Sequence, residues 1–383
     1  MTRIYLIRHA EAEGNLYRRC QGHFDGRITP RGRRQIDALA ERFRDQPIDA
    51  VYASDLTRTQ VTAQAILRTH PGLTLCIDPR LKEIGMGAWE NQPWGNMERD
   101  TPEMVEYFST DPERWHVPGG ESFQHLGDRM LACVTELARR HEGQTIALVS
   151  HGMAIRTLLC RLKGLKSREV SQIPHGDNTA VHTLSWDGEK LAVLAFNDNS
   201  HLPPELSPFS KQNWWKDNKG SDRHNLSFRP LDPARDKERY LTSYADCWRC
   251  AHRDTAGFVP SPYWTTALSR AAACPDAVAV VEMAGDFAGV MELDTARGAE
   301  TGLGWISLFY LTPECRGHGL GVQLLGQSVA VYRNLGRSRL CLHVAPDNAP
   351  ARRFYRHYGF GQTGEDPGAT GPLLRLEREL ELP

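Results

Sequence analysis

Apolar and polar positions follow one order before residue 200 and a different order after residue 225. In the first part, short apolar runs typical of buried strands alternate with stretches whose apolar residues recur at helical spacing. The predicted strands are 4–8, 50–53, 75–77, 145–150, 180–186 and 190–196, and the predicted helices are 30–44, 57–69, 122–141 and 153–162. This alternation predicts an α/β domain with a mostly parallel sheet and helices on both of its faces.

The second part has runs of strands with helices placed between them, which is typical of an α+β domain with a mixed sheet. The predicted strands are 226–231, 277–283, 287–293, 305–311, 339–344 and 373–380, and the later predicted helices are 320–335 and 349–358. Residues 201–225 are rich in Asn, Asp, Ser, Pro and Lys and show no period, so they are interpreted as a linker. The predicted organisation is a domain at 1–200, a linker at 201–225 in which Trp214–Trp215 docks on a domain surface, and a domain at 226–383.

Composition narrows the possible partners. The 383 residues exceed the usual size of one hydrophobic core, and the net charge of -1 provides no basic excess for nucleic acid or an anionic membrane. Since no apolar run is long enough for a membrane span or a signal peptide, we expect a cytoplasmic protein. Its nine cysteines are expected to be reduced thiols. Cys247, Cys250 and His252 form at most a partial metal site, and the helical pattern around them favours a plain helix, so no metal is expected.

Two histidines, two arginines and a carboxylate follow the predicted strands of the first part. Arg8 and His9 end the first strand, Arg58 opens the helix after the second, Glu83 follows the third, and His151 ends the fourth. The carboxyl ends of strands in an open α/β sheet form the edge where ligands bind. An imidazole nucleophile, arginines that hold phosphate oxygens and a carboxylic acid that protonates the leaving oxygen are the groups that phosphoryl transfer through a phosphohistidine requires.

The motifs that carry these residues resemble the histidine phosphatase superfamily, which includes the phosphoglycerate mutases. They are "RHAE" from Arg8, "ASDLTRTQVTA", "GAWE", "PGGES" and "SHG", with Ala10 and Ala12 in place of the family's usual glycine and its frequent Ser or Thr. The resemblance implies a three-layer α/β/α phosphoglycerate mutase-like domain in which His9 is the nucleophile and Glu83 the proton donor. It also implies that the substrate phosphate is bound by Arg8, Asn15, Gln21, Gly22, Arg58 and His151.

A glycine-rich turn in the second part lies between a predicted strand and a predicted helix. Three glycines fall within the six residues from Arg316 to Gly321, directly before the helix. Backbone N–H groups and the helix N-terminus together favour an anion at such a turn. The turn lacks the Lys-Ser/Thr ending of a P-loop.

This turn and the later "DNAPARRFYRHYGF" resemble the two motifs of the GNAT acetyltransferases over residues 226–383. The resemblance implies acetyl-CoA as co-substrate and Tyr355 as the acid that protonates the departing thiolate. The strand that would pair with the pantetheine arm is formed by Leu308, Phe309, Tyr310 and Leu311. The expected cofactor-binding loop residues are Arg316, Gly317, His318, Gly319, Leu320 and Gly321, together with Asn348. Glu292, on a central predicted strand, is a candidate general base.

The sequence therefore predicts a bifunctional enzyme that hydrolyses a phosphate monoester of a small metabolite and acetylates an amine. We expect a phosphatase in the first domain because the stretch from Glu83 to His151 is short for a mutase. Two alternatives stay open. The first domain could be a phosphoglycerate-type mutase, or the GNAT domain could sense a CoA ester and regulate the phosphatase. A homo-oligomer is possible.

Overall fold

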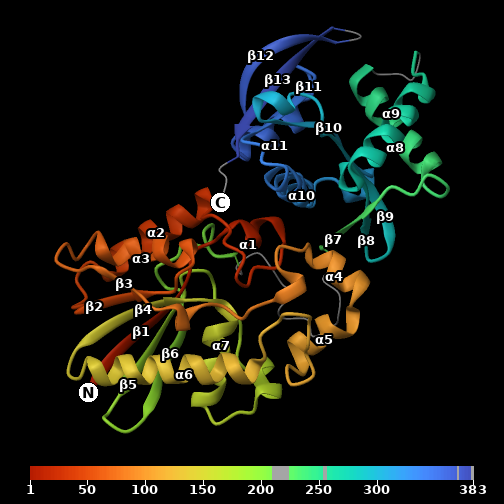
Figure 1. The fold of residues 1–383 in the computed structure, drawn as a ribbon. Helices are drawn as coiled ribbons and strands as arrows, with labels where there is room; N and C mark the ends of the chain where they lie inside the picture. Colours follow the sequence, from red (N-terminus) through yellow and green to blue (C-terminus); the bar gives the residue numbers. More distant parts are fainter. Residues whose placement is uncertain (209–223, 253–256, 369–370, 381–383) are drawn as a thin grey trace. The chain divides into compact units, whose positions relative to one another are not determined.

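The computed structural model of the chain describes residues 1–208, 224–252, 257–368 and 371–380, with the side chains of residues 250–252 left out. The predicted docking of Trp214–Trp215 lies outside these residues. Contacts divide the chain into two units, one formed by Met1–Gln92 and Asp100–Asp222 and the other by Pro93–Arg99 and Arg223–Pro383. Each unit contains one mixed sheet, as the alternating and clustered strand patterns predict (Figure 1).

The first unit has a six-stranded sheet in the order β3-β2-β4-β1-β5-β6. Its strands are β1 (Thr2–Arg8), β2 (Ala50–Ala53), β3 (Leu75–Ile77), β4 (Thr145–Ser150), β5 (Val181–Trp186) and β6 (Leu191–Asp198). The first four are parallel, whereas β5 and β6 are antiparallel and are joined by the Asp187–Gly188 turn. The register of β1 on β4 pairs Arg8 with Ser150, so the residues that follow both strands are neighbours.

Helices cover both faces of this sheet and make the three-layer α/β/α arrangement that the pattern predicts. Figure 1 shows α2 and α3 on one face and α6 and α7 on the other. The helices and short 3-10 turns of the first unit are α1 (Glu13–Tyr17), α2 (Pro30–Phe43), α3 (Thr57–Leu67), η1 (Pro79–Leu81), η2 (Gly87–Trp89), α5 (Pro102–Thr110), α6 (Phe123–Arg140), α7 (Gly152–Leu162) and η3 (Ser167–Gln172). A further helix, α4 (Trp94–Asp100), belongs to the second unit as far as Arg99.

The core explains why β1 and β4 are apolar along most of their length. Ile4, Leu6 and Ile7 in β1 are fully buried because helices pack on both sides of the strand. On the face of α2 and α3, Ile7 packs in one cluster with Phe43 and Val149. The apolar run ends at Arg8, where the sheet ends and the site begins.

The second unit has a seven-stranded sheet in the order β12-β13-β11-β10-β9-β8-β7. Its strands are β7 (Leu226–Pro230), β8 (Val278–Met283), β9 (Asp286–Asp294), β10 (Leu303–Leu311), β11 (Arg339–Val344), β12 (Gly361–Gly368) and β13 (Gly371–Glu379). Its helices are α8 (Lys237–His252), α9 (Pro260–Ala273), α10 (Gly321–Asn334) and α11 (Ala349–His357), with 3-10 turns η5 (Pro275–Ala277), η6 (Ala299–Thr301) and η7 (Pro313–Cys315). In Figure 1, α8 and α9 lie on one side of the sheet and α10 on the other.

One parallel pair interrupts this otherwise antiparallel sheet. β10 pairs with β11 only from Leu303 to Ile306, although both strands continue beyond this pairing. A bulge between Ile306 and Leu308 bends β10 at the same place. The two strands therefore separate, and the backbone of β10 from Leu308 onward has no strand partner on that side among the described strands.

Candidate active sites

The ends of β1 and β4 bring the two predicted histidines together. The His9 amide donates to the carbonyl of Ser150 at 2.9 Å, which continues the strand pairing by one residue. The rings of His9 and His151 then lie with their centroids 5.2 Å apart. Both side chains are buried, so the strand register alone places two imidazoles at the expected edge of the sheet.

The hydrogen bonding of His9 determines which ring nitrogen is available. Its Nδ1 lies 2.7 Å from the carbonyl of Ala10, and because a carbonyl only accepts, Nδ1 carries the proton. Burial lowers the pKa of His9 well below its usual value, and the positive charges of Arg58 and Arg8 lower it further. The ring is therefore neutral near pH 7, with its lone pair on Nε2, which is the form that can attack phosphorus.

Arg58 occupies the centre of the site and is fully buried. It donates from Nη2 to the carbonyl of Gly22 at 2.6 Å and from Nη1 to that of Phe24 at 2.8 Å. Its Nε donates to Nδ1 of His151 at 3.2 Å. Burial lowers the pKa of Arg58 to about 10, so it stays charged at neutral pH.

His151 is fixed in one neutral tautomer by these contacts. Since Nδ1 accepts from Arg58, the proton lies on Nε2 and is donated to Oγ of Ser54 at 2.9 Å. Burial lowers the pKa of His151 well below its usual value, with the charge of Arg58 as the next cause. His151 thus lies beside His9, with both ring nitrogens bonded to protein groups.

Arg8 lies at the end of β1 and is held by a loop that precedes β5. Its Nη1 donates to the carbonyl of Gly176, whereas its Nε is buried and has no partner among the residues the structure describes. Burial lowers the pKa of Arg8, and the carboxylates of Glu83 and Asp177 partly offset this shift. A buried guanidinium with one N–H unused is a ready donor for an anion.

The predicted phosphate loop is ordered by contacts within itself. Asn15 accepts the Ala12 amide at 3.1 Å with its side-chain oxygen. Gln21 accepts the Gly14 amide at 2.7 Å, and its Nε2 is buried without a partner in the described part of the chain. The Gly22 carbonyl faces Arg58, and an added Cβ at Gly22 would lie 2.4 Å from the carbonyl of Ile84, so only glycine fits there.

Glu83 places its carboxylate at the start of α7. Its Oε2 accepts the amide of Met153 at 3.0 Å and its Oε1 accepts that of Ala154 at 2.8 Å. These amides belong to the first turn of α7, where N–H groups have no intrahelical partner and the helix dipole favours an anion. Because His151 directly precedes this turn, the same backbone positions both Glu83 and His151.

Two residues of the first site were not predicted from the sequence. Asn178 donates from Nδ2 to the carbonyl of His9 at 3.0 Å and to Oδ1 of Asn15 at 3.4 Å. Glu90 accepts the amides of His23 and Phe24 at 2.7 and 2.8 Å and thereby holds the loop that Arg58 contacts. The polar run His175–Thr179 before β5 was the available signal for Asn178, and the "GAWE" motif ends at Glu90.

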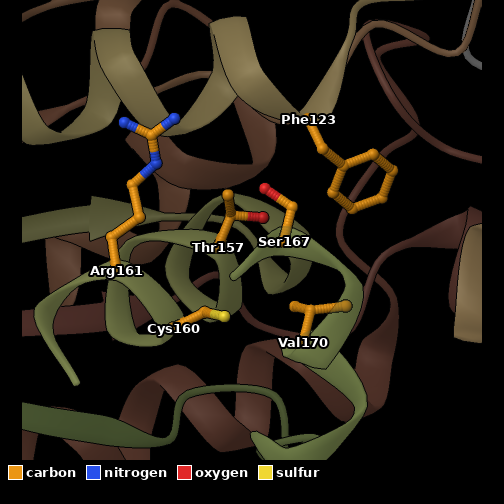
Figure 2. A pocket seen from close by; sticks show the side chains of 6 residues that line it. All are labelled: Phe123, Thr157, Cys160, Arg161, Ser167 and Val170. Atoms are coloured by element: carbon orange, nitrogen blue, oxygen red, sulfur yellow. The ribbon is translucent and has the colours of Figure 1, made fainter. Parts of the chain in front are cut away.

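Aromatic residues near this site serve as packing rather than as a polar pocket wall. Trp89 and Trp115 are each 4% exposed and lie edge to face at 5.8 Å, with Phe108 and Phe123 against them. A shallow depression, too small to enclose a water molecule, lies beside Phe123 between α7 and η3 (Figure 2). It is lined by Phe123, Thr157, Cys160, Arg161, Ser167 and Val170, none of which belongs to the predicted site.

The glycine-rich turn of the second unit connects η7 to α10. Gly317 and Gly319 take φ values of +78° and +77°, and an added Cβ at either would meet no atom within 4 Å. In the described part of the chain, the backbone amides from Gly317 to Gly321 donate to no acceptor. Such a row of free N–H groups before a helix is an anion-binding arrangement.

Arg316 anchors this turn to α8. Its Nε donates to the carbonyl of Leu311 at 2.8 Å, and its Nη2 donates to Oδ2 of Asp246 at 2.7 Å. The guanidinium carbon also lies 5.2 Å from the centroid of the Tyr310 ring. Hence the side chain of Arg316 fixes the turn, while the glycine amides that follow it stay free.

The two remaining predicted residues of the second site lie on α11. Asn348 caps this helix by accepting the Ala351 amide at 3.1 Å. Burial raises the pKa of Tyr355, and the nearby Cys247 raises it further. The phenol therefore carries its proton at neutral pH, as an acid must, although the raised pKa makes it a weaker acid than a free tyrosine.

Glu292 is fully buried, and its carboxylate is shared among three side chains. It accepts from Nη1 of Arg270 at 2.5 Å and from the hydroxyls of Tyr240 and Tyr244 at 2.8 and 2.9 Å. A carboxylate bonded in this way is a fixed structural anion rather than a base open to an amine. In this structure Glu292 is therefore held by three side chains, and its role as general base stays a prediction.

Among the residues that the structure describes, no group of three or more His, Cys, Asp and Glu side chains has the arrangement of a metal site. Cys247 lies on α8, as the helical pattern predicts, and the side chains of Cys250 and His252 are outside what the structure describes. None of the helices in this part of the chain combines the length and the apolar character needed to cross a bilayer.

The folds of both units agree with comparisons to known families. The histidine phosphatase superfamily (branch 1) matches residues 4–199, about half of the chain, and the acetyltransferase (GNAT) family matches residues 238–360. The chain therefore belongs to the histidine phosphatase superfamily and carries a GNAT acetyltransferase domain after the phosphatase-type domain.

Two individual proteins illustrate the first match. A probable phosphoglycerate mutase, GpmB, of Yersinia pestis (strain Pestoides F) is 40% identical over 165 residues, which are 43% of this chain and 76% of that protein. The structure of Bacillus stearothermophilus YhfR superposes with a TM-score of 0.51 at 30% identity and covers 52% of this chain and 99% of its own.

Proposed function

We propose that the chain hydrolyses a phosphate monoester through a phosphohistidine at His9 and transfers an acetyl group from acetyl-CoA to an amine. The observation that carries the first activity is the neutral, buried His9, whose Nε2 lone pair is available beside Arg8, Arg58 and His151. Histidine phosphatase and GNAT family membership support the pairing of the two activities.

In the first reaction, Nε2 of His9 attacks phosphorus and the bond from phosphorus to the leaving oxygen breaks. Arg8, Arg58, His151, Asn15, Gln21 and Gly22 are proposed to bind the phosphate oxygens. The unused buried donors at Arg8 Nε and Gln21 Nε2 support this assignment, because buried N–H groups of this kind require an acceptor. The charge that develops on the oxygens is then met by these two donors, which are already in place. The Nε2 proton of His151 and the amide of Gly22, which bond Ser54 and Glu90 in this structure, would exchange these partners for the phosphate.

Glu83 is proposed to handle the protons of both half-reactions. As an acid it protonates the leaving alkoxide, and as a carboxylate it then deprotonates the water that attacks the phosphohistidine. Inorganic phosphate departs, and His9 returns to its neutral form. The contacts of Glu83 with the Met153 and Ala154 amides support this role, since they hold the carboxylate at the same helix start that carries His151.

In the second reaction, the free amides of Gly317 to Gly321 are proposed to bind the pyrophosphate of acetyl-CoA. The backbone of Leu308 to Leu311, which β11 leaves unpaired, is proposed to bond the pantetheine arm. Acetyl-CoA supplies the acetyl group, a neutral amine attacks its thioester carbonyl, and the C–S bond breaks as Tyr355 protonates the leaving thiolate. The nitrogen then loses one proton, which passes through water to the phenolate of Tyr355 and restores it. These groups match the donor set that the ligand's phosphates and amides require.

Paired variants of the full chain test the proposal. His9→Ala should abolish release of phosphate from p-nitrophenyl phosphate and leave thiol release from acetyl-CoA with a panel of amines unchanged. Tyr355→Phe should lower acetyl transfer by about 10²-fold and leave phosphate release unchanged. Unchanged phosphate release in His9→Ala would contradict the first activity, and unchanged acetyl transfer in Tyr355→Phe would contradict the acid role.

The name of the Yersinia relative favours a second candidate for the first domain, a phosphoglycerate-type mutase. A mutase returns the phosphoryl group to the substrate, so it interconverts phosphoglycerate isomers without net loss of phosphate. Incubation of each isomer with the full chain distinguishes the two, because hydrolysis releases phosphate and isomerisation does not. A further alternative, regulation by a CoA ester, predicts that acetyl-CoA changes the rate of phosphate release.

A further inference from the structure

The "PGGES" motif of the first unit has no role in the mechanism proposed above, yet its glutamate lies next to the segment that carries Glu83. Glu121 directly precedes Ser122, which caps α6, and it pairs with Arg129 two turns later on that helix. The side chains of Glu121 and Arg129 are only 12% and 14% exposed. The mechanism above assigns no role to this nearly buried ion pair, and burying two charges costs free energy unless their contacts repay it.

All five N–H groups of Arg129 donate hydrogen bonds, either to backbone carbonyls near Glu83 or to the carboxylate of Glu121. Three bonds hold the backbone from Arg80 to Glu83: Nη1 donates to the carbonyls of Arg80 and Lys82 at 2.8 and 2.7 Å, and Nη2 donates to that of Glu83 at 2.8 Å. The other two are the bidentate bonds to Glu121 at 2.6 and 2.7 Å. One planar guanidinium thereby fixes the backbone on both sides of the Glu83 side chain.

Glu121 bonds the backbone just after Glu83, at Gly85. Its Oε2 accepts the amide of Gly85 at 3.2 Å, and its own amide donates to the carbonyl of Gly85 at 2.8 Å. Burial alone would raise the pKa of Glu121, but the bonds from Arg129, Gly85 and His125 outweigh it and lower the pKa. Glu121 is therefore an anion that keeps Arg129 in a single orientation.

Hydrogen bonds hold both the backbone and the carboxylate oxygens of Glu83. Its backbone is held by Arg129 and its oxygens by the amides of Met153 and Ala154 in α7. A proton donor must reach the leaving oxygen within hydrogen-bond distance, so a shift of the backbone of even a fraction of an ångström weakens the transfer.

We propose that Arg129 and Glu121 are positioning residues that aim Glu83 at the leaving oxygen of the substrate. This inference rests on the proposed phosphatase activity. It predicts an effect that grows with the need for an acid: a poor leaving group requires protonation, whereas a good one departs with little help. A residue that only stabilised the fold would change both substrates alike.

The test measures kcat/KM of the full chain with phenyl phosphate and with p-nitrophenyl phosphate, whose phenolate is the better leaving group. Arg129→Lys keeps the positive charge but cannot reach the three carbonyls together, and Glu121→Gln removes the anion that orients Arg129. Arg140→Gln is the matched control, because Arg140 lies on the same helix, is more than half exposed and bonds only to Glu136 among the described residues. Thermal unfolding of each variant gives its folded fraction.

We expect Arg129→Lys and Glu121→Gln to lower kcat/KM at least about tenfold for phenyl phosphate and less than about threefold for p-nitrophenyl phosphate. Arg140→Gln should change neither value. Glu83→Gln should show the same preference, and Arg129→Lys added to it should cause little further loss. Equal losses for both substrates would overturn the positioning role while leaving the phosphatase proposal intact. Equal rates in the wild type and His9→Ala would overturn both.

Discussion

Replacement of Gly319 by alanine should affect two quantities that can be measured separately. Backbone strain lowers the free energy of unfolding, and the added methyl group lowers the affinity for acetyl-CoA. Gly319 has φ of +77°, where an L-residue other than glycine costs about 1–2 kcal/mol. Since an added Cβ meets no atom within 4 Å, no steric cost adds to this strain. In acetyl-CoA binding, however, the methyl group enters the space where we propose that the pyrophosphate lies.

Gly336 provides the matched control at the other end of α10. Its φ is +67°, and an added Cβ there also meets no atom within 4 Å, so Gly336→Ala should cost the same free energy of unfolding. Thermal unfolding should show that the melting temperature of both variants is lowered by about 2–4 °C for each kcal/mol of lost free energy of unfolding. Isothermal titration should show that Gly319→Ala binds acetyl-CoA at least about tenfold more weakly than the wild type, a loss of about 1.4 kcal/mol in binding free energy. The affinity of Gly336→Ala for acetyl-CoA should be unchanged.

Equal acetyl-CoA affinity in Gly319→Ala and wild type would refute the argument, because the turn would then accept a side chain while the ligand is bound. An equal loss in both variants would also refute it, since it would trace the effect to strain in α10 rather than to the turn. Circular dichroism at the titration temperature keeps these outcomes apart from simple unfolding.

Three further predictions follow from single contacts. Burial lowers the pKa of His9, so kcat/KM, corrected for ionisation of the substrate, should fall with decreasing pH with a midpoint below 6.5. A midpoint at or above 6.5 would contradict a buried, neutral nucleophile. Thr62→Val should lower the free energy of unfolding by about 1–3 kcal/mol in chemical denaturation, since the Ala10 amide loses its 2.9 Å acceptor, and an unchanged stability would show that water replaces it. Asp246→Asn should raise the KM for acetyl-CoA about five- to thirtyfold at constant kcat, as Arg316 loses a charge-assisted bond, and a loss in kcat alone would argue against a binding role.

Much of the fold follows from periodicity alone. The strands β2, β3, β4 and β11 have the predicted bounds. β2 and β4 are almost wholly buried and therefore leave a continuous apolar signal, whereas β3 is a partly exposed edge strand that only its apolar residues mark. α5 and β12 were not outlined from the pattern. No residue of α5 is buried, and β12 contains three glycines and a proline, so neither has the apolar spacing that marks an element.

The first site was predictable where a residue directly follows a strand, as at Arg8, His9 and His151. Contacts between distant loops left no such signal. Asn178 reaches the carbonyl of His9 across 169 positions of sequence, and the polar run His175–Thr179 does not show which of its residues reaches the site. Glu292 shows the converse: its place on a central strand suggests a base, and the sequence gives no sign that Arg270 on α9 bonds it.

The account depends most directly on whether His9 takes up the phosphoryl group. Glu83→Gln with p-nitrophenyl phosphate should accumulate the phosphoenzyme, because the good leaving group departs without an acid while the attack of water lacks its base. Mass spectrometry of peptides prepared at neutral or alkaline pH should then find one phosphoryl group on His9 and none in His9→Ala. A phosphoryl group on His151, or continued product release with no phosphorylated residue, would contradict the account.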